Sequence, residues 1–213
     1  MQVNRVVPEV EPLPAFPTFS LEVNAEEISR ARVFGEPLRP LGEPTPAENR
    51  ALAQAILAGL QTLDITERLA VFEGFLRDHP ASPWRASLLG NLGVLYRRNG
   101  YFTRAEAALR EAWALSKDGT AAEAKTIAVA ALGELLDIYT RFGRIEPLDE
   151  MLAQAEGREI WGSPAERLRE ARMGSWILHN AHERAVPSGP RALGRIRSFL
   201  NVAAAPRRLN RSS

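Results

Sequence analysis

Apolar residues recur at helical spacing along most of the chain, beginning at Pro46. Thr45, Pro46 and Glu48 form a typical helix start, because they supply a hydroxyl cap, a proline in the first turn and an acid. Further start and stop signals predict helices that begin near residues 46, 64, 85, 103, 123, 147, 163 and 190. No stretch shows the alternation of a half-buried strand. The pattern therefore predicts an all-α protein of about seven or eight helices.

Two kinds of signal mark the ends of the central helices. Gly100 and Gly143 stand where a left-handed residue is needed to end a helix. Thr103 and Glu106 have the spacing of a capping box, which predicts the start of the helix that follows Gly100. Ser163, followed by a proline and Glu166, predicts another start of this kind.

The first part of the chain has a different composition. Residues 1–50 contain eight of the fifteen prolines, and proline disfavours a helix at its own position and at the one before. Residues 1–46 are therefore predicted to be an extended or disordered arm, with a short helix over 25–33 that Asn24 caps. The arm is expected to lie over the helical domain through Phe16, Phe19, Leu21 and Phe34.

Residues 86–119 have the spacing of a known repeat, with small residues where two helices would approach closely and large ones in the seam between them. They resemble the 34-residue tetratricopeptide (TPR) repeat. This resemblance implies antiparallel helix pairs that stack into an α-solenoid, in which each pair buries the face its neighbour leaves open. The matching residues are Leu89, Leu92, Gly93, Tyr96, Gly100, Ala105, Leu109 and Ala112.

A second copy follows when Tyr139 is aligned with Tyr96 and Gly143 with Gly100. This copy has leucine where the first has Gly93 and Ala105, so looser packing is expected there. An ordinary helical bundle that matches the repeat in one helix pair is the alternative. The predicted organisation is an arm over residues 1–46, a TPR-like domain over 47–183 and a basic tail with one short helix over 184–213.

A narrower resemblance covers roughly residues 35–200. Residues 82–84, 92–93, 100–102 and 112–115 resemble the tetratricopeptide region of large bacterial YD-repeat (RHS-type) surface proteins. In that family the helical region leads into a papain-like peptidase of the bacteriocin-processing type. Residues 188–193 with Ile196 look like the opening of that peptidase, with Ser188 in place of the nucleophilic cysteine. This likeness implies an inactive peptidase fragment with a vestigial nucleophile position; the alternative is that Ser188 caps a helix before Pro190.

The repeat resemblance also implies a binding groove, because the first helix of each TPR pair lines a concave surface. Arginine and asparagine side chains on such a surface suit an acidic peptide or a carboxylate, which makes a protein partner the expected ligand. A solvated charged face is the alternative. The groove positions are Asn91, Val94, Arg97, Arg98, Asp137 and Arg141.

Composition limits the other possible functions. The chain has no cysteine, its formal net charge is +1, and no apolar run is long enough to cross a membrane. His179 and His182 next to Glu183 have a spacing that can share a metal, but no third ligand is evident and solvated residues at a helix end are the better explanation, so no cofactor or metal is expected. Seven arginines and no acid follow residue 183, which leaves a basic nucleic-acid adaptor as a further alternative. The sequence thus predicts a non-catalytic scaffolding protein without a signal peptide, of unknown location, with the cytoplasm as the default.

Overall fold

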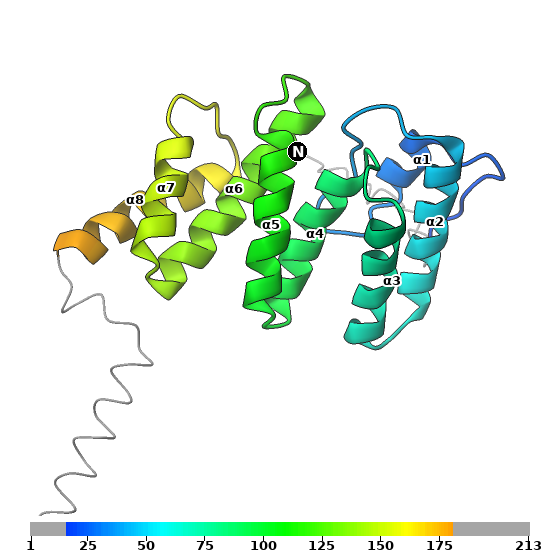
Figure 1. Ribbon diagram of the computed structural model, residues 1–213, viewed down its shortest axis with the longest axis horizontal. Coiled ribbons are helices and arrows are strands. Elements are labelled where there is room, and N and C mark those ends of the chain that lie inside the picture. Colours follow the sequence, from blue (N-terminus) through cyan, green and yellow to red (C-terminus); the bar gives the residue numbers. More distant parts are fainter. Residues whose placement is uncertain (1–15, 181–213) are drawn as a thin grey trace, which may run out of the picture. The chain divides into compact units, whose positions relative to one another are not determined.

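The computed structural model describes residues 16–180 of the chain (Figure 1). These residues form eight helices and no strand, which confirms the predicted all-α class. The chain divides into two compact units, residues 1–92 and 93–213, with the boundary inside α4 (Arg85–Arg98). The helix predicted near residue 190 and the basic tail lie outside the described residues.

The first unit contains α2 (Pro46–Gln61) packed against α3 (Ile65–Asp78). The predicted start of α2 is confirmed: Thr45 accepts a hydrogen bond from the Glu48 backbone, and the Glu48 carboxylate accepts one from the Thr45 backbone. Asp64 caps α3. Large side chains that are at most 1 % exposed fill the core between these helices and the start of α4: Leu52, Ile56, Leu69, Phe72, Trp84 and Leu88.

Residues 16–44 also belong to the first unit and include the short helix α1 (Ala25–Arg30), which Asn24 caps as predicted. Ile28 is 1 % exposed, and the Phe34 ring lies 5.0 Å from the Phe72 ring. The predicted role of Leu21 as an anchor is wrong, because Leu21 is 95 % exposed, whereas Phe16 is half exposed.

Main-chain hydrogen bonds tie residues 36–41 to the start of α4. The backbone N–H of Arg39 donates to the Ser87 hydroxyl at 2.9 Å, and that of Leu41 donates to the Pro83 carbonyl at 2.9 Å. A proline-rich extended segment has few regular partners for its amides, so these bonds satisfy amides that no helix or sheet would pair. This segment is therefore a packed part of the first unit.

The second unit is built around α6 (Ala122–Phe142), of whose 21 residues 13 are buried. Three helices pack against α6: α5 (Phe102–Ser116), α7 (Ile145–Gln154) and α8 (Ser163–Asn180). Gly143 has a φ of 62° and ends α6 in the left-handed conformation, as predicted. Two residues then join α6 to α7, so consecutive helices turn back on each other (Figure 1).

The predicted capping box at the start of α5 is wrong. The helix begins at Phe102, so Thr103 already lies in its first turn, and no side chain caps it. The Glu106 carboxylate instead accepts hydrogen bonds from Tyr139 and Arg144. A carboxylate next to a tyrosine hydroxyl and a guanidinium has stronger partners than a backbone amide one turn away.

Glycines set the distances between helices in the second unit. A Cβ on Gly93 would lie 2.5 Å from Leu109 Cγ, and one on Gly174 would lie 2.6 Å from Thr140 Cγ2. A Cβ on Gly133 would lie 3.0 Å from Pro164 Cβ at the start of α8. Gly93 was expected to allow such an approach, whereas Gly133 and Gly174 are contacts that the repeat pattern did not indicate. These three positions let neighbouring helices pack closer than any side chain allows.

We expect Gly93→Ala to destabilise the protein by about 1–3 kcal/mol, because Leu109 is fully buried and cannot move away from the added methyl group. Gly74→Ala in α3 is the matched control. Its Cβ would meet only the flexible end of Arg77 at 3.5 Å, so the gain in helix propensity should stabilise by about 0.5–1 kcal/mol. Urea unfolding followed by circular dichroism measures both. Equal effects of the two changes would contradict the close contact.

Candidate functional site

Five charged side chains on three helices of the second unit form one connected set, which we call the arginine–carboxylate network. Glu134 on α6 lies 2.8 Å from Arg97 on α4 and 2.6 Å from Arg167 on α8. Asp137, one turn further along α6, lies 3.1 Å from Arg97 and 2.6 Å from Arg141. Arg97 therefore joins the two carboxylates, and the network links α4, α6 and α8.

Burial in this network is uneven. The Glu134 and Asp137 side chains are each 8 % exposed, whereas that of Arg141 is 69 % exposed. Buried carboxylates are stable only when cations and hydrogen bonds replace water, and here each has two guanidinium partners. The hydrogen bond and the charge of Asp137 raise the pKa of Arg141 above its ordinary value. Three arginines face two carboxylates, so the network carries one net positive charge, and its cations are nearer to solvent than its anions.

The structure separates the six predicted groove residues. Asn91 belongs to the first unit and is buried, since its side chain accepts a hydrogen bond from the Glu36 backbone and donates one to the Ser87 carbonyl. Arg97 and Asp137 pair with each other in the less exposed part of the arginine–carboxylate network. Val94 is half-buried, and the residues that reach solvent are Arg98 and Arg141.

Two members of the network, Glu134 and Arg167, were not predicted. Glu134 was detectable in principle, because Glu134 and Asp137 are the only charged residues in the otherwise apolar run 127–139 of α6. A carboxylate in a buried stretch requires a cation. Arg167 carried no signal of its own, because only the packing of α8 on α6 brings it to Glu134.

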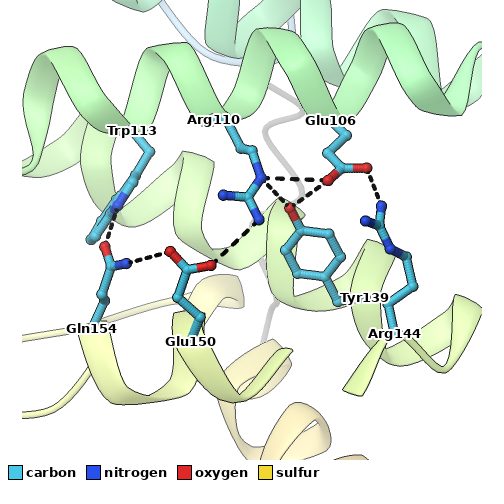
Figure 2. A network of polar contacts seen from close by, with 7 residues as sticks. All are labelled: Glu106, Arg110, Trp113, Tyr139, Arg144, Glu150 and Gln154. Atoms are coloured by element: carbon cyan, nitrogen blue, oxygen red, sulfur yellow. Dashed lines mark hydrogen bonds and ion pairs between the residues drawn. The ribbon is translucent and has the colours of Figure 1, made fainter. Parts of the chain in front are cut away.

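A second polar cluster connects α5, α6 and α7 (Figure 2). The Tyr139 hydroxyl donates to the Glu106 carboxylate at 3.0 Å and accepts from Arg110 Nε at 2.7 Å. Figure 2 shows Arg144 reaching the same carboxylate from the start of α7. Farther along the seam, Trp113 on α5 donates to Gln154 on α7 at 2.7 Å.

The Tyr139 cluster contains a phenol and a carboxylate, which are groups that enzymes use for proton transfer, beside the guanidinium of Arg110. Tyr139 is nevertheless 0 % exposed, and its hydroxyl already has both an acceptor and a donor in the protein. Burial, with the hydrogen bond to Glu106, raises the pKa of Tyr139 to about 12. The phenol thus stays protonated at neutral pH and fastens α6 to α5.

The remaining candidates from the sequence have separate environments. Trp84 and Trp113 are buried and donate to Asn49 and Gln154, whereas Trp161 and Trp176 are half exposed. His179 Nε2 lies 3.2 Å from Asp149. Ser188, His182 and Glu183 lie outside the described residues.

Comparisons with known proteins add no relative: no family model, no curated protein and no solved structure matches the chain. Among residues 16–180, no group of three or more histidine, aspartate or glutamate side chains is arranged to hold a metal ion. No helix in this part of the chain is long and apolar enough to span a membrane.

The network predicts unequal effects for its members. Glu134→Ala removes a buried carboxylate and leaves Arg97 and Arg167 facing each other, so we expect a loss of about 2–4 kcal/mol in the free energy of unfolding. Arg141→Ala should cost less than about 1 kcal/mol, because Arg141 is mostly exposed and Asp137 keeps Arg97. Urea unfolding of the two variants checks this order. Equal losses would show that the network is not built around its buried carboxylates.

Tyr139 predicts a pH dependence of stability at alkaline pH. Its pKa is higher in the folded protein, about 12, than the ordinary 10.0, so folding favours the protonated phenol. This contribution is complete below pH 10 and is lost as the pH rises from 10 towards 12. In Tyr139→Phe the decline in unfolding temperature over this range should be smaller than in the wild type. Thermal scans at matched pH values measure the difference, and parallel declines would contradict the assignment.

Proposed function

We propose that the chain is a non-catalytic, TPR-like helical module that binds an acidic segment of a partner protein through Arg98 and Arg141. The observation that carries this proposal is the distribution of charge in the second unit. The carboxylate of Asp137 is buried, whereas the guanidinium groups of Arg98 and Arg141 extend to solvent. Exposed arginines suit carboxylate ligands, because their planar groups can donate two parallel hydrogen bonds.

Three packing features support the TPR-like part of the proposal. Gly93 sits against Leu109, the pair that the consensus places at the crossing of two helices. Ala105 and Ala112, the other small consensus positions, are 0 % exposed. Tyr96 and its counterpart Tyr139 are also buried. The tyrosine position of the seam is therefore buried in both copies of the motif, which favours a repeat over a bundle that matches by coincidence.

Arg98 and Arg141 also have an alternative explanation that involves no ligand. Arg98 and Arg141 lie in the last turns of α4 and α6, where a cation interacts favourably with the helix dipole. Arg141 in addition pairs with Asp137. Arg98 has no ion-pair partner among the described residues, and a dipole contribution at an exposed position amounts to only about 0.3–1 kcal/mol. Its exposed guanidinium is thus available to a ligand.

Selection from a library of displayed random peptides tests the proposal. The wild-type protein should enrich peptides rich in aspartate and glutamate, and their affinity should fall as salt is added. The double variant Arg98→Ala/Arg141→Ala should lose about tenfold or more in affinity for these peptides, because two exposed charge contacts are removed. Arg97 is left unchanged, since its loss would disturb the buried network.

A charge-matched control separates local contacts from overall charge. The variant Arg77→Ala/Lys125→Ala also removes two cations, one from α3 and one from the start of α6. Lys125 is about 24 Å from Arg141 along the helix axis. This control should bind the selected peptides as the wild type does. Enrichment of peptides without acidic residues, or equal losses in both variants, would refute the proposal.

A further inference from the structure

Three aromatic side chains are exposed at one end of the second unit, and we call them the aromatic patch: Tyr101, Phe102 and Phe142. Tyr101 and Phe102 lie at the start of α5, and Phe142 is the last residue of α6. Their exposed fractions are 38 %, 42 % and 45 %. The rings of Phe102 and Phe142 meet edge to face with centroids 4.8 Å apart, so these two rings form one continuous surface made by two helices.

The patch differs from single apolar residues elsewhere on the surface. An isolated exposed apolar side chain is ordinary, but a contiguous exposed group is typical of a contact surface. The rings of Phe102 and Phe142 already pack edge to face on each other, which restricts their orientation before a ligand arrives. A pre-ordered ring loses little conformational entropy on binding and therefore suits an apolar anchor.

The charge around the patch indicates which partner it suits. The stretches 93–106 and 137–146, which hold the patch, contain five arginines and three acids. Two of those acids, Glu106 and Asp137, are 19 % and 8 % exposed and are engaged with arginines of the same unit. Arg98 and Arg141, which neighbour the patch in sequence, extend to solvent. The surface thus presents aromatic rings beside cations, a composition typical of binding hot spots.

We infer that the aromatic patch receives a bulky apolar side chain of the acidic partner, so that the ligand is a linear acidic segment with a phenylalanine, leucine or isoleucine among its acids. This inference rests on the proposed function and makes it more specific. The carboxylates of the segment pair with Arg98 and Arg141, and its apolar side chain covers Phe102 and Phe142. Charge alone would attract any acidic chain, whereas the rings select segments with an anchor.

Two fluorescein-labelled synthetic peptides test the inference with the full chain. Both are short runs of aspartate and glutamate; one has a central phenylalanine and the other has serine at that position. Fluorescence anisotropy at low salt should show about tenfold tighter binding of the phenylalanine peptide to the wild type. The variant Phe102→Ser/Phe142→Ser should remove this preference and bind both peptides as weakly as the wild type binds the serine peptide.

Two matched controls accompany the measurement. Leu115→Ser changes another half-exposed apolar residue of α5, about 20 Å from Phe102 along the helix, and should preserve the preference. Phe142→Tyr keeps the ring and should preserve it too. Circular dichroism checks that the double variant is folded, and the comparison of two peptides on the unaltered wild type does not depend on that variant.

The outcomes separate this inference from the proposed function. Equal affinity of the wild type for the two peptides would overturn the inference while leaving acidic recognition intact. A preference that persists in Phe102→Ser/Phe142→Ser would place the anchor elsewhere and also overturn it. If neither peptide binds, the proposed function itself fails. If sedimentation shows that the wild type self-associates through these two phenylalanines, the occupant is a second copy of the chain, and the inferred ligand is wrong.

Discussion

The second unit depends on two carboxylates, Glu134 and Asp137, held inside α6. An ionised carboxylate with little water around it is stable only beside cations, and these come from α4, α8 and the end of α6 itself. The pairing fixes not only that these helices are adjacent but also how they are shifted along one another, because the guanidinium and carboxylate groups must meet within about 3 Å. Apolar packing alone tolerates a range of such shifts.

Close glycine contacts and the Tyr139 cluster add two further constraints to the same helix. Gly133 and Gly174 bring α8 against α6, while Tyr139, through Glu106 and Arg110, fastens α5 on another side. Many charged side chains between these helices are engaged in ion pairs or hydrogen bonds of the arginine–carboxylate network and the Tyr139 cluster. The few that remain exposed, above all Arg98, are consequently the residues that a partner can reach without disturbing the fold.

The difference between buried and exposed arginines explains why the positions of charged residues in the sequence are a poor guide to which of them a ligand could reach. Arg97 and Arg98 are adjacent and chemically identical, yet Arg97 bridges two buried carboxylates and Arg98 extends to solvent. A helix turns by about 100° per residue, so neighbours in sequence face different surroundings. Of the six groove residues expected from the repeat pattern, Asn91, Arg97 and Asp137 serve the interior, and the aromatic patch was outside the expected set altogether.

The sequence by itself determined the helical class and most helix ends, because apolar periodicity, caps and left-handed glycines act within a few residues of one another. Thr45, Asn24 and Gly143 function as their local signals predicted. Only the tertiary structure decided that Glu106 accepts hydrogen bonds from Tyr139 and Arg144 in place of the expected capping contact. It also decided that Arg167 pairs with Glu134. These partners lie more than 30 residues apart, and the energy of a charge depends on which helices exclude water from it, which no local pattern records.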